Sequence, residues 1–93
     1  MATPNTDTPT GRLAAALRAR RRELGLTQKQ LGDLAGCGVA FLYELEAGKP
    51  TVRLDKLLDV LAVLGLELRL DEGHSGLAVA AQLQPPADGD KSQ

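Results

Sequence analysis

The apolar residues of this chain, mostly leucine and alanine, recur at helical spacing along most of its length. Leu13, Leu17 and Leu24 fall on one face of a helix that is predicted to run from about Thr10 or Gly11 to Leu24. The glycine that follows is expected to end this helix. Three further helices are predicted over Thr27–Ala35, Val39–Ala47 and Leu54–Leu64.

The hydrophobic period changes directly after the fourth predicted helix. The residues LELRL at 66–70 alternate strictly between leucine and a charged residue, which is typical of a β-strand. A lone strand cannot satisfy its backbone hydrogen-bonding groups, and no second strand is evident, so the pattern predicts antiparallel pairing with the same segment of a second subunit. The alternative is unpaired extended chain that covers the helices. The predicted dimerisation residues are Leu66, Glu67, Leu68, Arg69 and Leu70.

These elements divide the chain into three parts. Residues 1–10 are predicted to form a flexible arm, and residues 11–70 form the folded domain. Residues 71–93 are predicted to be a mostly disordered acidic tail, in which LAVAAQL at 77–83 can form a transient helix or dock on a partner. The predicted fold class is all-α with one short C-terminal strand.

Two short predicted helices and a glycine turn lie between Leu26 and Gly48. Thr27 can cap the first helix, and Gln30 follows three residues later, which is the spacing of a capping box. The turn GCG at 36–38 breaks that helix before the apolar stripe restarts. A second helix that projects at a steep angle across the first is the layout of a helix-turn-helix DNA-binding unit.

The charge of the chain is unevenly distributed. The whole chain carries −1 at neutral pH, which is unusual for a protein that binds DNA. Residues 11–25 carry +4, because five arginines face one glutamate, whereas residues 71–93 carry −3. A polyanion near the first helix therefore meets a basic field that the overall charge conceals.

Length and composition exclude several other classes of protein. Ninety-three residues make at most one small domain, which often depends on a partner subunit. The single cysteine excludes an internal disulfide framework and fits a reducing cytoplasm. No signal peptide is evident, and no segment approaches the roughly 18 apolar residues of a membrane helix. We therefore expect a cytoplasmic protein without membrane contact.

The order of these motifs resembles the XRE family, whose domain is shared with the lambda-type repressors and the Cro proteins. The resemblance implies a lambda-repressor-like domain of four to five short helices. The segment 44–52, followed by Leu54 and the predicted strand, is similar to HipB-type antitoxins. That similarity implies a homodimer and a HipA-type serine/threonine kinase toxin as partner. The matching residues are Leu24-Gly25-Leu26-Thr27-Gln28, Leu31, Ala35-Gly36, Leu42, Leu45, Glu46, Gly48, Leu57, Leu61 and Leu64-Gly65.

The resemblance also implies which residues face DNA. Thr27 and Gln28, at the start of the second helix, are both expected at the DNA surface. Gln28 is expected to bond a phosphate; otherwise it is an ordinary exposed residue. Where family members carry polar residues, this chain has Gly38 at the cap position, followed by Val39 and Ala40. Val39 and Ala40 can touch a thymine methyl but cannot bond a base edge.

The rest of the expected contacts come from the end of the third helix and the loop after it. Tyr43 can bond a phosphate or a base, and Glu44 can accept a hydrogen bond from cytosine but also repels phosphates. Lys49, Thr51 and Arg53 are expected to clamp a phosphate; the alternative is a solvated loop. The resemblance further implies a partly buried ion pair between Arg21 and Glu46.

Phe41 is either an anchor on the DNA backbone or a partly buried core residue.

The reactive side chains of the sequence give no catalytic or metal site. Cys37 is interpreted as a small buried hydrophobe rather than a redox sensor. His74 has no cysteine or histidine nearby at ligand spacing, and Ser75 adjoins it only in the tail. We therefore expect no enzyme activity, no metal and no cofactor.

Together these features predict a homodimeric repressor that binds an inverted-repeat operator in double-stranded DNA and associates with the bacterial nucleoid through that DNA. The two second helices of the motif would lie about one DNA turn, roughly 34 Å, apart. The leading hypothesis is the antitoxin of a HipA-type kinase. The alternatives are a stand-alone XRE-type regulator and a protein-interaction module that does not bind DNA.

Overall fold

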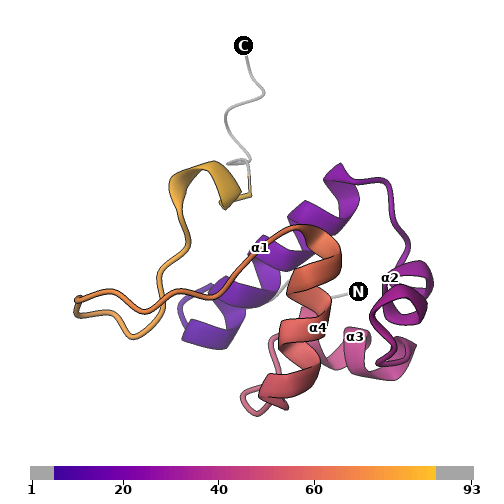
Figure 1. The fold of residues 1–93 in the computed structure, drawn as a ribbon. Helices are drawn as coiled ribbons and strands as arrows, with labels where there is room; N and C mark the ends of the chain where they lie inside the picture. Colours follow the sequence, from indigo (N-terminus) through magenta and orange to yellow (C-terminus); the bar gives the residue numbers. More distant parts are fainter. Residues whose placement is uncertain (1–5, 86–93) are drawn as a thin grey trace.

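The computed structural model describes residues 6–85 of the chain. Figure 1 shows α1 as the long helix that lies behind α4, with α2 and α3 grouped to one side of both. After α4 the chain runs across α1, turns, and returns to lie against it. The elements are α1 (Pro9–Glu23), α2 (Gln28–Ala35), α3 (Val39–Glu46), α4 (Leu54–Leu64) and one 3₁₀ turn, η1 (Ala81–Leu83).

The ends of α1 differ slightly from the prediction. The helix begins at Pro9 rather than at residue 10 or 11, because the side chain of Thr8 accepts a hydrogen bond from the backbone N–H of Gly11 at 3.0 Å. Proline suits the first helical position, since its missing N–H would have no partner there. The helix ends at Glu23, one residue before the predicted end.

The capping box of α2 forms as predicted. Thr27 accepts a hydrogen bond from the backbone N–H of Gln30 at 3.0 Å, and the Gln30 side chain accepts one from the backbone N–H of Thr27 at 2.8 Å. Helix α4 has the bounds that the sequence predicts, and α3 ends one residue earlier than predicted. The fold is all-α, as expected.

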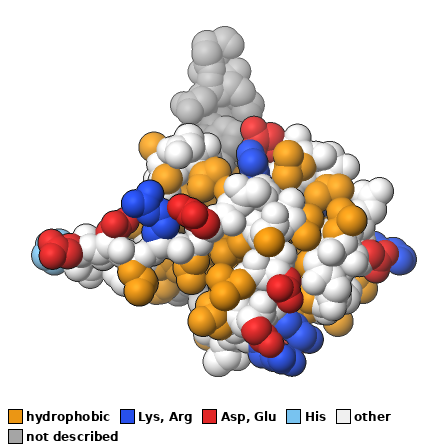
Figure 2. Space-filling view, in the orientation of Figure 1, with side chains coloured by type: hydrophobic (Ala, Val, Ile, Leu, Met, Phe, Trp, Pro, Cys, Tyr) orange, Lys and Arg blue, Asp and Glu red, His pale blue; other side chains and the backbone are white. Residues whose placement is uncertain are grey.

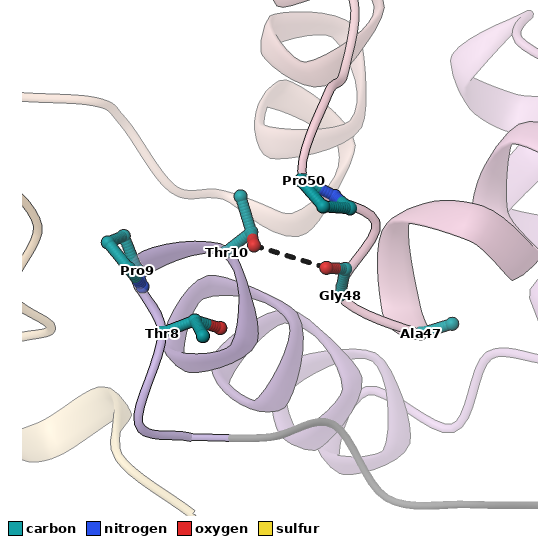
Figure 3. Close-up of a pocket in the computed structure, with 6 residues that line it drawn as sticks. All are labelled: Thr8, Pro9, Thr10, Ala47, Gly48 and Pro50. Atoms are coloured by element: carbon teal, nitrogen blue, oxygen red, sulfur yellow. Dashed lines mark hydrogen bonds between the residues drawn. The ribbon is translucent and has the colours of Figure 1, made fainter.

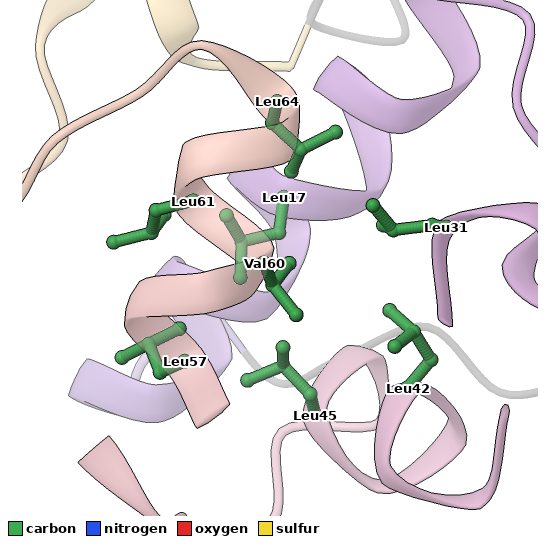
Figure 4. Close-up of a cluster of buried hydrophobic side chains, with 8 residues drawn as sticks. All are labelled: Leu17, Leu31, Leu42, Leu45, Leu57, Val60, Leu61 and Leu64. Atoms are coloured by element: carbon green, nitrogen blue, oxygen red, sulfur yellow. The ribbon is translucent and has the colours of Figure 1, made fainter. Parts of the chain in front are cut away.

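All four helices contribute to one hydrophobic core (Figure 4). Leu31 and Leu42 are completely buried, and the side chain of Leu17 from α1 reaches the same cluster. Burying a leucine contributes about 1.5–3 kcal/mol, so this cluster is the main source of stability for the domain. The core residues are Leu17, Leu31, Leu42, Leu45, Leu57, Val60, Leu61 and Leu64.

The segment 66–70 is not a strand in this single chain, and residues 6–85 contain no strand. A strand is defined by hydrogen bonds to a neighbouring strand, and these would have to come from a second subunit. Leu66 packs against the core, whereas Leu68 and Leu70 are exposed.

Part of the predicted tail lies on α1. The Arg12 guanidinium donates hydrogen bonds to the backbone carbonyls of Leu77 at 3.2 Å and Ser75 at 3.5 Å. Alternate side chains of this segment, Leu77 and Val79, are partly buried, and η1 contacts α1. Residues 86–93 of the predicted tail and residues 1–5 of the predicted arm lie outside the described part of the chain.

Candidate DNA-binding surface

The turn between α2 and α3 brings the backbones of the two helices close together. The carbonyl of Gly32 accepts hydrogen bonds from the backbone N–H groups of Cys37 at 3.1 Å and Gly38 at 3.3 Å. A side chain at position 32 would place its Cβ 2.8 Å from the carbonyl carbon and oxygen of Gly38. Gly36 and Gly38 have φ values of 73° and 83°, which favour glycine. The glycines therefore allow the close crossing from which α3 projects.

Helix α3 has one buried and one exposed face. Its buried residues are Leu42, Leu45 and Glu46. On the opposite face Ala40, Tyr43 and Glu44 are exposed, and 52% of the surface of Tyr43 is accessible. Val39 is partly buried, and Gly38 at the N-cap provides no side-chain hydrogen bond. The face that remains accessible therefore carries a methyl group, a phenol and a carboxylate.

A buried ion pair connects α1 to α3. Arg21 Nε lies 2.7 Å from one carboxylate oxygen of Glu46, and a terminal nitrogen of the same guanidinium lies 2.9 Å from the other. The remaining terminal nitrogen donates to the backbone carbonyl of Leu26 at 2.8 Å. Arg21 is 8% exposed and Glu46 2%, so the pair is shielded from water. It holds α3 against α1 and against the loop that enters α2.

The side chain of Gln28 belongs to the same network. Its amide nitrogen donates to Glu46 at 3.0 Å, so this side chain points toward the ion pair. Thr27 is engaged in the capping box through its hydroxyl. A phosphate bound by Gln28 would have to share or displace the hydrogen bond to Glu46. The contacts predicted between these two residues and DNA therefore stay predictions.

Both cations of the loop between α3 and α4 have acidic partners. Lys49 Nζ lies 3.2 Å from Glu44, and Arg53 contacts both carboxylate oxygens of Asp55 at 3.1 and 2.6 Å. The hydrogen bond from Arg53 lowers the pKa of Asp55, and the same contact raises the pKa of Arg53. Thr51 is exposed between them. The loop therefore presents a weaker positive field than its two cations alone would provide.

A shallow groove runs between α3 and the start of α4, beside the exposed face of α3. Phe41 is one of the residues that line this groove, and it packs against the core. Its ring lies under Lys56, whose Nζ is 5.6 Å from the ring centre. This distance is within the range of a cation–π contact. Cys37 also lines the groove and is only partly buried, and this burial raises the pKa of its thiol. Phe41 therefore has a packing role, and the sequence carried no signal for its contact with Lys56.

A family model described as a helix-turn-helix domain matches residues 12–72, which include most of α1, all of α2, α3 and α4, and the segment 66–70. This chain belongs to the helix-turn-helix domain family. Its similarity to XRE-type domains, which the sequence motifs indicate, is confirmed.

A relative of known sequence supports the same family. An uncharacterized HTH-type transcriptional regulator of Sinorhizobium fredii, y4mF, is 43% identical over 56 residues, which span 60% of this chain and 74% of the relative. None of the helices in residues 6–85 is long and apolar enough to cross a membrane.

A hydrogen bond connects the start of α1 to the loop that follows α3, at the C-terminal end of the helix-turn-helix unit. The Thr10 hydroxyl donates to the backbone carbonyl of Gly48 at 3.1 Å (Figure 3). Thr8 and Pro9 line the pocket beside this bond, opposite Ala47. The contact fixes the loop that carries Lys49. Sequence reasoning missed it because a hydroxyl that bonds a distant carbonyl has no signature in sequence.

Proposed function

We propose that this chain is a sequence-specific DNA-binding transcriptional repressor that acts in the bacterial cytoplasm as a homodimer on an inverted repeat. Its membership of the helix-turn-helix family supports DNA binding and transcriptional regulation. The printed name of the Sinorhizobium relative supports the same broad role.

The observation that carries the proposal is the way α3 is held. Its inner face is fixed by the core and by the Arg21–Glu46 pair, while its outer face remains exposed. A helix that is held from one side and projects from a tight turn is suited to enter the major groove. Ala40 and Tyr43 would then face bases or the groove wall, with Lys49, Thr51 and Arg53 beside the phosphates.

This surface supports modest discrimination between bases. Ala40 can contact a thymine methyl, and Tyr43 and Glu44 each offer one polar group. One good bidentate pair is worth roughly 1–3 kcal/mol, and no side chain on this face has the fork geometry of arginine or the amide of asparagine. Specificity would therefore depend largely on the spacing of two half-sites and on DNA shape.

The basic field of α1 is also smaller than the sequence indicates. Three of its five arginines are engaged within the domain: Arg12 with the returning tail, Arg20 with the carbonyl of Leu64, and Arg21 with Glu46. Phosphate contacts would therefore come mainly from the helix N-termini and the loop after α3.

A gel-shift assay with the promoter region of the chain's own gene tests this proposal. We expect a discrete shifted band that a competitor with the same composition and a scrambled sequence does not remove. Tyr43→Ala is expected to weaken the band, and Gln82→Ala in η1 is the matched control that leaves it unchanged. Equal competition by scrambled DNA, or no band, would favour a protein-interaction module instead.

The partner of the dimer is a separate part of the proposal. The similarity of the segment 44–52 and of LELRL to HipB-type antitoxins supports a HipA-type serine/threonine kinase toxin as partner. Co-purification with the product of a neighbouring kinase-like gene tests it. A chain that purifies alone from its native host would support the stand-alone regulator.

A further inference from the structure

The segment 66–76 projects from the body of the domain (Figures 1 and 2). It leaves the end of α4 after Leu66, which packs against the core. Leu68 is 49% exposed and Leu70 is 97% exposed, so Leu70 gains almost nothing from the fold of its own chain. An alternating leucine segment that projects into solvent is expected to be covered in the working protein.

The charges in this segment are complementary to those of a second, antiparallel copy of the same segment. Glu67 and Arg69 stand one on each side of Leu68, and both are exposed. In an antiparallel pair, residues directly opposite each other share a face of the sheet. If Leu68 lies opposite Leu68 of the partner subunit, Glu67 lies opposite Arg69 of the partner subunit, and Arg69 lies opposite Glu67 of the partner subunit.

We infer that two copies of this chain pair through residues 66–70 in one register, with the two-fold axis at Leu68. This inference rests on the homodimer proposed above and adds its register. Two Glu67–Arg69 ion pairs then form on one face of the two-stranded sheet. On the other face Leu70 meets Leu66 of the partner subunit, which is the leucine that packs against the partner's core. The exposed Leu70 is thereby covered.

The neighbouring registers are disfavoured by charge and by polarity. An axis at Glu67 puts two glutamates opposite each other. An axis at Arg69 puts two arginines opposite each other and places Glu67 against Asp71. An axis between two residues puts a leucine opposite a charged residue. Like charges directly opposite each other destabilise a sheet. Only the axis at Leu68 places every leucine of the segment opposite a leucine and every charged residue opposite one of opposite charge.

An axis at Leu70 is the nearest competitor. It places Arg69 opposite Asp71 of the partner subunit, which is a favourable pair. However, Leu68 then faces Glu72 and Leu66 faces His74, so two of the three leucines lose their apolar partners. The axes at Leu68 and at Leu70 can be distinguished directly, because each brings a different residue next to its own copy.

Cysteine cross-linking distinguishes these registers. In the full-length chain with Cys37→Ser, we compare Leu68→Cys with Leu70→Cys, using a short bismaleimide and reading the covalent dimer by denaturing mass spectrometry. With the axis at Leu68, the Leu68→Cys sites meet, whereas the Leu70→Cys sites lie roughly 13 Å apart along the strands. We expect several-fold more covalent dimer from Leu68→Cys. Stronger cross-linking of Leu70→Cys would overturn the register.

Charge reversal provides a second test that does not depend on cysteine. Glu67→Arg and Arg69→Glu each place like charges opposite each other in a homodimer, and both are expected to weaken self-association. A mixture of the two variants restores both ion pairs, so the heterodimer should dominate in native mass spectrometry. The double variant E67R/R69E should dimerise like the unchanged chain, because it only exchanges the two charges. Equal homodimers and heterodimers in the mixture would contradict the register.

These experiments need no DNA, so they fail separately from the proposed function. A chain that is monomeric at all concentrations but shifts its promoter fragment would overturn this inference and leave DNA binding in place. A chain that dimerises with the predicted cross-link but binds no DNA would support the register and overturn the proposed function.

Discussion

Glu46 is a buried carboxylate whose partners determine how α3 is held. It accepts two hydrogen bonds from Arg21 and one from Gln28, and it is 2% exposed. A buried ion pair adds little net stability compared with apolar residues of the same size, but removing one partner leaves an unpaired charge. The network therefore acts mainly to position α3.

Arg21→Ala is expected to lower the free energy of unfolding by about 3–5 kcal/mol, because Glu46 would remain buried without its cation. Urea denaturation monitored by circular dichroism measures this loss. Arg22→Ala is the matched control, since Arg22 is the next residue of the same helix and is exposed. Unchanged stability of Arg21→Ala would contradict the positioning role of the pair.

The pairing of Lys49 with Glu44 gives a prediction about DNA affinity. Glu44→Gln removes the carboxylate that holds Lys49, so we expect tighter binding to DNA of any sequence and a steeper salt dependence, by about 0.9 in the logarithmic slope for one more phosphate contact. Fluorescence anisotropy with a labelled duplex measures both. Weaker binding to operators with one particular cytosine would instead show that Glu44 reads that base.

At the scale of the elements, most of the helix boundaries could be predicted from sequence. The capping box of α2 and the apolar stripe of α4 depend on residues three or four positions apart, so both can be recognised in the sequence. The predicted start of α1 is one or two residues later than the observed start at Pro9. Thr8 and Thr10 are both suitable caps, and Pro9 at the first helical position was the signal that separates them.

The candidate site was less predictable than the helices. Exposure of Ala40, Tyr43 and Glu44 follows from the period of α3, which any amphipathic helix displays. The hydrogen bonds from Arg12 and Thr10 to distant backbone carbonyls could not be predicted from the sequence. Every residue carries a backbone carbonyl, so the sequence does not indicate which one accepts the bond. The pairing of Lys49 and Arg53 with acidic neighbours also depends on how the loop after α3 turns.

The crossing of α2 over α3 gives a prediction at this scale. Gly32→Leu adds a side chain where the backbone of Gly38 lies 2.8 Å from the new Cβ, so the helices must separate. Although leucine favours helix formation, we expect overpacking to lower the free energy of unfolding by about 1–3 kcal/mol. We also expect weaker DNA binding. Thermal unfolding and the gel shift measure these effects.

Gly73→Leu is the control for Gly32→Leu, because a Cβ at that exposed position would have no atom within 4 Å other than those of Gly73 and its two chain neighbours. It adds the same side chain outside the helix-turn-helix unit and should leave unfolding unchanged. If both variants behaved alike, close packing of α2 on α3 would not explain the position of α3.

At the scale of the whole molecule, charge and assembly are connected. The net charge is −1, and both cations of the loop after α3, Lys49 and Arg53, are already paired with acidic residues of the same chain. One subunit therefore offers few phosphate contacts, and a dimer doubles them without any new residue. Pairing through Leu66–Leu70 would thus raise affinity and also set the spacing of two half-sites.

The most direct test of the central claim is the salt dependence of binding to a duplex from the chain's own promoter region, measured by fluorescence anisotropy from about 50 to 200 mM salt. Phosphate contacts release counterions, so log K should fall linearly with log salt, with a slope near −0.9 for each phosphate neutralised. We expect the slope to correspond to at least two such contacts, one from each subunit. Binding that does not change over this range would contradict recognition of DNA through the helix-turn-helix surface.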